Sequence, residues 1–135
     1  MISGLDHVAA PMQAVDAMLA FYRRLGGTIK QEYFGLLYSI HFGNTKLSFH
    51  TPELWRDENM TLRGRTALPG SGDFCFVWEG GQDELSALLK DLGADVEDGP
   101  VERTGGRGRG ALGMSVYTRD PDHNLVEFIC YGTAN

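Results

Sequence analysis

Helix-like and strand-like patterns occur twice along the chain in the same order. Between residues 13 and 25, apolar side chains recur every three or four positions, which predicts an amphipathic helix that ends at Gly26 and Gly27. A short strand candidate precedes it at 5–10, and three others follow at 28–33, 35–42 and 45–50. From residue 73 the order returns: strand 73–78, helix 82–93, then strands around 94–103, at 114–118 and at 125–131. The simplest account is a tandem repeat of strand-helix-strand-strand-strand modules.

The segment between the two modules has a different composition. Residues 51–72 are polar and punctuated by proline and glycine, which indicates a linker or a lid rather than a further strand. We therefore expect module one at about 1–50, the linker at 51–72 and module two at about 73–135. A chain of 135 residues is long enough for one such domain and too short for two ordinary ones. The predicted fold class is α+β, with a single domain over residues 1–135.

Composition narrows the classes of partner. The chain is 42% hydrophobic and 22% charged with a formal net charge of −6, values typical of a globular domain. The negative charge argues against nucleic acid or an anionic membrane as the main partner, so a small molecule is the expected ligand. No export signal or membrane-spanning run is evident, and we expect a cytoplasmic protein. Cys75 and Cys130 lie in separate strands and lack paired spacing, which predicts free thiols.

Side-chain alternation assigns the polar residues of the strands to one face. In the last strand, Val126 and Phe128 belong to the apolar row, which leaves Glu127 on the opposite face. A buried ionised carboxylate is costly unless it is paired or bound to a metal, so Glu127 needs a specific partner. The same alternation places His7 on the corresponding face of the first strand. Glu127 and His7 are therefore candidate functional residues.

The repeat relates these positions to others. Aligning the two helix cores makes Asp73 the counterpart of His7, whereas aligning the helix ends pairs His7 with Phe74 instead. The strand at 45–50 places Ser48 and His50 on the polar face, and Ser48 is the counterpart of Glu127.

Two stretches of the chain resemble a known group of proteins. "LDHVAAPMQAVDAMLAFYRRLGG" is similar to the opening of the vicinal oxygen chelate superfamily, which contains glyoxalases, bleomycin-resistance proteins and extradiol dioxygenases. "RDPDHNLVEFI" resembles the closing turn and glutamate-bearing strand of that superfamily, with His123 where the family usually has glycine. The resemblance implies two tandem βαβββ modules that form a half-open barrel around a cleft. It also implies a divalent metal in that cleft.

The resemblance gives roles to the polar-face residues. It favours Asp73 over Phe74 as the counterpart of His7, since the family usually carries a polar ligand there. The metal set becomes His7, His50 and Glu127, with His50 replacing the carboxylate or amide expected at Ser48. Two imidazoles and one carboxylate suit Ni, Zn, Mn, Co or Fe(II). Asp73 is a fourth ligand or a catalytic base, and Glu127 is the other catalytic candidate.

The implied function is a metal-dependent, glyoxalase-like lyase or isomerase. It would act on a small α-oxygenated carbonyl or thiohemiacetal through an enediolate, with Asp73 or Glu127 moving the proton. Two alternatives stay open: an Fe(II) extradiol-type dioxygenase, and a metal-free protein that binds a bleomycin-type drug. Short members of the group commonly pair, so the resemblance also implies a homodimer.

The Gly/Arg segment "TGGRGRGALG", residues 104–113, has two interpretations. Its glycines and arginines could cradle a phosphate or close over an anionic substrate. It lacks the Lys-Ser/Thr ending and the helix context of a phosphate-binding loop, which favours a simple connection before a strand.

Overall fold

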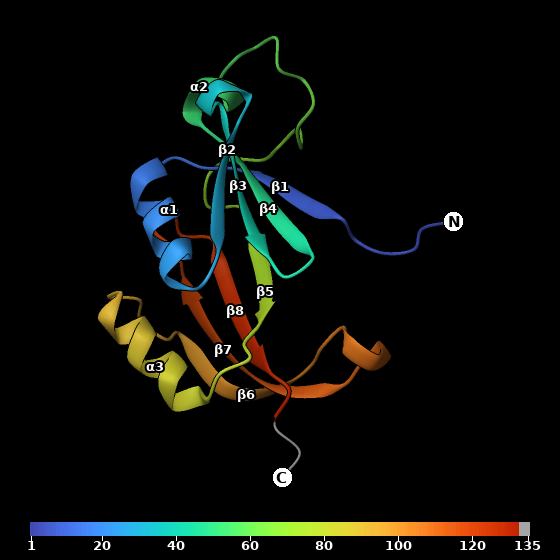
Figure 1. Cartoon of the computed structure of the whole chain (residues 1–135), viewed down its shortest axis with the longest axis vertical. Helices are drawn as coiled ribbons and strands as arrows, with labels where there is room; N and C mark the ends of the chain where they lie inside the picture. The colour runs from blue at the N-terminus through green and yellow to red at the C-terminus, as the bar shows by residue number, and fades with distance from the viewer. Residues whose placement is uncertain (133–135) are drawn as a thin grey trace. The chain divides into compact units, whose positions relative to one another are not determined.

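The computed structural model describes residues 1–132 and contains two compact units (Figure 1). The first comprises residues 1–72 together with the turn 121–123, and the second begins at Asp73 and holds the rest of the described chain. The division falls between Gly72 and Asp73, where the polar segment gives way to the second strand-helix pattern.

The first unit is a four-stranded mixed sheet with one long helix. Its elements are β1 (His7–Pro11), α1 (Val15–Arg24), β2 (Thr28–Glu32), β3 (Leu37–Phe42) and β4 (Thr45–His50). The strand order is β1-β4-β3-β2, in which β1 and β4 are parallel and the other pairs antiparallel. A one-turn 3₁₀ helix at Tyr33–Gly35 joins β2 to β3, and Phe34 within it has a positive φ of 58°.

The second unit repeats this architecture. Its elements are β5 (Asp73–Val77), α3 (Gln82–Asp91), β6 (Asp98–Thr104), β7 (Leu112–Arg119) and β8 (Leu125–Cys130). The strand order is β5-β8-β7-β6, and β5 and β8 are again the parallel pair. The predicted fold class and the βαβββ repeat are therefore confirmed, with two open sheets that do not close into a barrel.

Each helix covers the apolar face that alternation predicted for its sheet. In the first unit Tyr22 of α1 packs against Phe49 of β4, with ring centroids 5.8 Å apart and both side chains fully buried. In the second unit Phe76 and Phe128 pack with ring centroids 6.0 Å apart, and Leu85 and Leu89 of α3 are 1% exposed. Burial of such side chains is the main source of stability in small domains.

Strand register shows how closely the modules correspond. Ala9 of β1 lies beside Ser48 of β4, and Cys75 of β5 lies beside Glu127 of β8. His7 lies two residues before Ala9 on β1, and Asp73 lies two residues before Cys75 on β5. His7 and Asp73 therefore occupy equivalent positions in the two modules. Ser48 is thus the structural counterpart of Glu127, and Asp73 rather than Phe74 is the counterpart of His7.

The turn between β7 and β8 belongs to the first unit. The Asp122 carboxylate accepts hydrogen bonds from the backbone N–H groups of Gln13 (2.7 Å) and Ala14 (2.8 Å), just before α1. Asp122 is buried, and its neighbour His123 has a φ of 71°. The turn position where the family usually has glycine therefore does adopt a positive φ, a conformation that histidine tolerates better than most residues.

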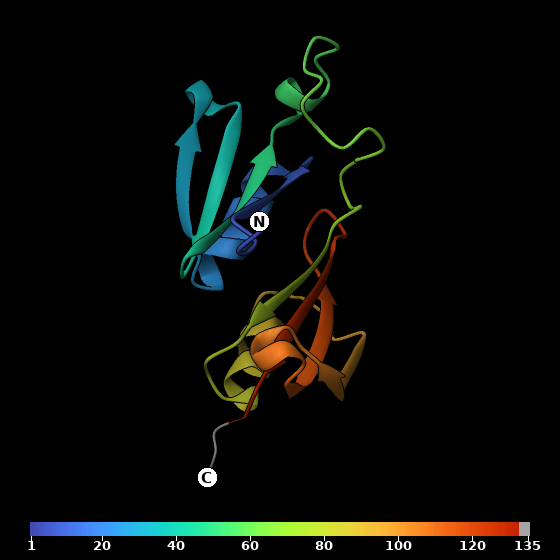
Figure 2. The same cartoon turned by 90° about the vertical axis from the view of Figure 1, so that its right-hand side faces the viewer.

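The segment 51–72 contains a short helix that its sequence pattern did not predict. α2 (Pro52–Trp55) begins at a proline, which suits the first turn of a helix, and Figure 2 shows the irregular chain that follows it. The Trp55 indole N–H donates to the Met12 carbonyl at 2.9 Å, which ties this segment to the end of β1. No helix in the described part of the chain is long and apolar enough to span a membrane.

Candidate functional site

Glu127 lies in the middle of β8, on the face of the second sheet opposite α3. The Ser115 hydroxyl of β7 donates a 2.6 Å hydrogen bond to Glu127 Oε2. Tyr117, directly across from Glu127 in the antiparallel pair, also forms a hydrogen bond with this carboxylate. The partners that a half-buried carboxylate requires are therefore supplied by the neighbouring strand.

The guanidinium group of Arg103 lies next to Tyr117. The Arg103 Nε of β6 donates to the Tyr117 hydroxyl at 3.0 Å, and the guanidinium carbon lies 5.5 Å from the centre of the tyrosine ring. Burial is the main cause that raises the pKa of Tyr117, and Glu127 raises it further while Arg103 opposes the shift. Since Tyr117 stays protonated at neutral pH, its hydroxyl can accept from Arg103 and donate to Glu127.

Cys75 lies beside Glu127 on the parallel strand β5. The residue is exposed, but burial around its sulfur and the negative charge of Glu127 raise the pKa of the thiol to about 12. A thiol with that pKa is protonated at neutral pH and is a poor nucleophile. Cys75 is thus a neighbour of the carboxylate rather than a reactive group, and both cysteines are free, as predicted.

Asp73 opens β5 on the same face as Cys75 and Glu127. It pairs with Leu125, two residues before Glu127 on β8, and its side chain is exposed. An offset of two residues corresponds to about 7 Å measured along the strand direction. Asp73 and Glu127 therefore form a pair of carboxylates on one face, of which Glu127 is the more enclosed.

The equivalent face of the first unit carries an ion pair, in which Lys46 Nζ lies 3.4 Å from Oε1 of Glu32. Ser48, the counterpart of Glu127, is buried and lies 3.3 Å from the hydroxyl oxygen of Ser39. His7 has a half-exposed side chain, and its Nδ1 lies 2.6 Å from Oδ1 of Asp6. The first unit thus presents hydroxyls, an accessible imidazole and a lysine–glutamate ion pair where the second presents the network around Glu127.

His50 shares the polar face with His7 but lies far along the strand. His7 pairs with Lys46 and Pro11 pairs with His50, so four residues separate the two histidines, about 13 Å on adjacent strands. Burial, and then the positive charge of Arg63, lower the pKa of His50. The separation and the nearby guanidinium both count against His50 as a ligand of the same cation as His7.

The candidate metal ligands are divided between the two units. The first unit brings His7 to the polar face and the second brings Asp73 and Glu127, so neither unit supplies three donors at these positions. Among residues 1–132 no three His, Cys, Asp or Glu side chains gather into a group that could hold a metal ion. Metal ligation by His7, His50 and Glu127 stays a prediction, and the geometry of the first unit weakens the part of it that concerns His50.

Ser115, Tyr117 and Arg103 were not anticipated from the sequence. Alternation within "MSVYT" does place Ser115 and Tyr117 on one face, but the pattern of one strand does not reveal which residues of a neighbouring strand lie opposite. That pairing requires the register of β7 against β8, and the contact with Arg103 requires the register of β6 as well.

Comparison with known proteins agrees with this architecture. The model of the glyoxalase/bleomycin resistance protein/dioxygenase superfamily matches residues 4–128. Glyoxalase domain-containing protein RDO1 of Mycosarcoma maydis is 33% identical over 135 residues, which cover 98% of this chain and 71% of that protein.

Two solved structures of similar proteins have the same fold as this chain. Virulence protein STM3117 of Salmonella typhimurium is 31% identical over 96% of this chain and 85% of its own length. Its crystal structure gives a TM-score of 0.82 and covers 98% of this chain and 99% of the other. Lactoylglutathione lyase from Agrobacterium tumefaciens gives a TM-score of 0.70 at 26% identity, with coverage of 96% and 95%. The chain therefore belongs to the glyoxalase/bleomycin resistance protein/dioxygenase superfamily.

Proposed function

We propose that the protein is a glyoxalase-like lyase or isomerase that acts on a small α-oxygenated carbonyl compound. Glu127 is the residue that moves the proton, and Asp73 is the second carboxylate on the same face. The observation that carries the proposal is the arrangement around Glu127, where Ser115 donates at 2.6 Å and Tyr117 also donates. Polar groups placed around a carboxylate in this way orient it for proton transfer.

Glu127 would move a proton between two neighbouring carbons of the substrate. The substrate carbon next to the carbonyl, which bears a hydroxyl group, loses its proton to the Glu127 carboxylate, and the C–H electron pair shifts toward the carbonyl oxygen to form an enediolate. The hydroxyl proton passes to that oxygen and Glu127 returns the carbon-bound proton to the former carbonyl carbon, so that the hydroxyl and the carbonyl have exchanged places. The enediolate oxygen carries negative charge, which a nearby cation stabilises, and Arg103 supplies a positive charge on this face.

The family resemblance implies a divalent metal, which would polarise the substrate oxygens when bound. The donors of each unit taken alone, among residues 1–132, do not make a metal site. Ligation by His7 and Glu127 stays part of the proposal as a prediction about metal content. The likeness to lactoylglutathione lyase supports the reaction class, at 26% identity over nearly the whole chain.

A metal-free binding protein is the second candidate. The observation that favours it is Ser48, a neutral hydroxyl hydrogen-bonded to Ser39 at the position equivalent to Glu127. A serine there removes the carboxylate that a four-ligand metal site would use. In either case we expect a homodimer in the cytoplasm, and light scattering after size exclusion tests the dimer.

Two assays test the proposed reaction. Protein purified without chelator is assayed with methylglyoxal plus glutathione, and separately with catechols while oxygen uptake is recorded. Turnover in the first assay supports the lyase or isomerase. Oxygen uptake in the second supports a ring-cleaving dioxygenase instead, and activity in neither removes both named reactions.

A further inference from the structure

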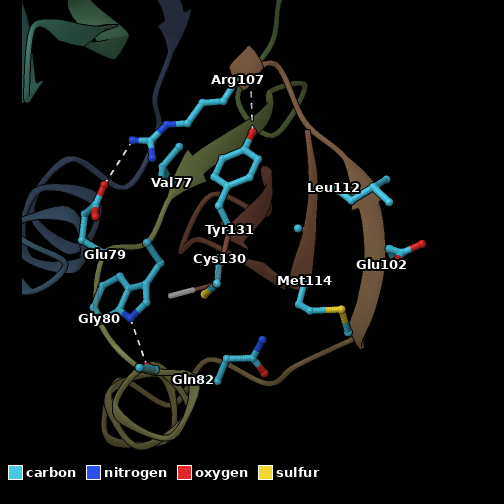
Figure 3. A pocket seen from close by; sticks show the side chains of 14 residues that line it. Val77, Glu79, Gly80, Gln82, Glu102, Arg107, Leu112, Met114, Cys130 and Tyr131 are labelled. Carbon is cyan, nitrogen blue, oxygen red and sulfur yellow. Dashed lines mark hydrogen bonds and ion pairs between the residues drawn. The ribbon is translucent and has the colours of Figure 1, made fainter. Parts of the chain in front are cut away.

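A cavity of about 460 Å³ opens in the second unit, where β5 and β8 end and α3 begins (Figure 3). Trp78, Gly81 and Gln82 line it on the α3 side, and Tyr131 lines it beyond the end of β8. Its volume lies within the range of small-molecule sites in proteins. Glu127, four residues before Tyr131, does not line it, so the proposed reaction leaves this cavity without a role.

Apolar side chains that are exposed to solvent line two sides of the cavity. Leu112 is 58% exposed, and Met114 and Val77 are each 38% exposed. Figure 3 shows Leu112 and Met114 on the β6–β7 side, facing across to Val77 and Tyr131. These side chains provide a surface on which an apolar group of a ligand can be buried.

The charged groups around the cavity are predominantly acidic. Glu79 and Glu102 line it together with a single cation, Arg107. The first turn of α3 adds Asp83 and Glu84, so the N-terminus of this helix already has acidic neighbours. An anionic ligand would meet this charge unfavourably, whereas a cationic ligand is complementary to it.

Arg107 shows how a cation is accommodated at the mouth. Its guanidinium carbon lies 5.2 Å from the centre of the Tyr131 ring, and its Nη2 lies 3.1 Å from Oε1 of Glu79. The backbone N–H of Arg107 also donates to the Tyr131 hydroxyl at 3.3 Å. An aromatic face combined with a carboxylate is a favourable environment for organic cations.

We propose that this cavity binds a small organic cation, whose ammonium group takes the place of the Arg107 guanidinium between Tyr131 and Glu79. The apolar body of the ligand lies against Leu112 and Met114. Arg107, from the Gly/Arg segment 104–113, is then an internal competitor that occupies the cation position while the cavity is empty. The segment would then respond to a cationic ligand, whereas its sequence had suggested a cradle for an anion.

The proposal is tested with benzyltrimethylammonium as the cationic probe and phenylacetate as an anionic control of similar size. Binding is followed by NMR on the full-length ¹⁵N-labelled protein through the indole N–H of Trp78, which donates to the Gly81 carbonyl at 3.1 Å. The chain has two tryptophans, so a Trp55→Phe variant assigns this resonance.

The expected effects have opposite signs for the two members of the ion pair. Arg107→Gln removes the competing cation and should tighten benzyltrimethylammonium about 3-fold, the range of an exposed cation–aromatic contact. Adding Glu79→Gln in the Arg107→Gln background removes the carboxylate and should weaken the probe by a similar factor. Glu127→Gln should leave binding of the probe unchanged, which separates this site from the proposed reaction.

Four results would overturn the inference. One is tighter binding of phenylacetate than of the cation, and another is weaker binding of the cation by Arg107→Gln. The third is a Trp78 resonance that does not shift with the cation although the circular dichroism spectrum is that of the folded protein. A loss of cation binding in Glu127→Gln would place the probe at Glu127 and would equally contradict the assignment.

Discussion

Tyr117 and Glu127 lie directly opposite each other on the antiparallel strands β7 and β8, the positions that Ser39 and Ser48 occupy on β3 and β4. The backbone register of the two modules is the same, but the chemistry differs. The first pair is two buried hydroxyls 3.3 Å apart, and the second is a phenol bonded to a carboxylate. At this matched position the second sheet therefore carries an ionisable pair, whereas the first sheet carries two neutral hydroxyls.

The charge of Glu127 should be measurable through Cys75. Because Glu127 contributes to the raised pKa of the Cys75 thiol, Glu127→Gln should lower that pKa from about 12, while burial keeps it above its ordinary value. We expect faster alkylation of Cys75 by iodoacetamide in mildly alkaline solution, measured in a Cys130→Ser background. Glu102→Gln is the matched control and should leave the rate unchanged. An unaltered rate in Glu127→Gln would mean that the carboxylate does not act on the thiol.

Asp122 should stabilise the start of α1. Asp122→Ala removes the acceptor of two backbone N–H groups at 2.7 and 2.8 Å from a buried position, which we expect to lower the free energy of unfolding. The loss should be about 1–2 kcal/mol, as for other capping side chains. Urea denaturation measures it, with the exposed Asp95→Asn as control. Equal stability of the two variants would show that the turn 121–123 does not hold α1.

His50 should make stability depend on pH. Its pKa is lowered in the folded protein, by burial first and Arg63 second, so the unfolded chain binds its proton more readily. The contribution of neutral His50 is complete above its ordinary pKa and is lost as pH falls through the lowered value. The slope is at most about 1.4 kcal/mol per pH unit for one proton.

Unfolding free energies from weakly acidic to neutral pH test this dependence. His50→Asn should flatten the slope, and Arg63→Gln should reduce it because a repelling charge is removed. A slope that is identical in wild type and His50→Asn would assign the pH dependence to other groups.

Metal content separates the roles of the two histidines. If His7 and Glu127 ligate a divalent metal, elemental analysis of chelator-free protein should show the metal, and His7→Ala or Glu127→Ala should remove it. His50→Ala should retain it, because His50 lies four residues along the strand from the pairing partner of His7. Loss of metal in His50→Ala with retention in His7→Ala would contradict the strand geometry.

The order of elements could be predicted from the sequence, because the helical and strand periodicities of "AVDAMLAFYRRL" and "LVEFICY" are strong. Alternation also assigned Glu127, His7 and Asp73 to polar faces correctly. The sequence could not give the partners of Glu127, since Ser115 and Tyr117 reach it through the pairing of β7 with β8, which no local pattern encodes. The helix at Pro52–Trp55 was missed because four residues are too few to show a period.

The most direct test of Glu127 as the proton-transferring residue is the initial rate with methylglyoxal plus glutathione, measured for wild type and Glu127→Gln. The substitution keeps the shape of the side chain and removes its capacity to accept the proton. We expect wild-type turnover and a fall of about 100-fold or more in Glu127→Gln, the contribution of a general base. Turnover in Glu127→Gln equal to that of wild type, with both proteins folded, would contradict the assignment.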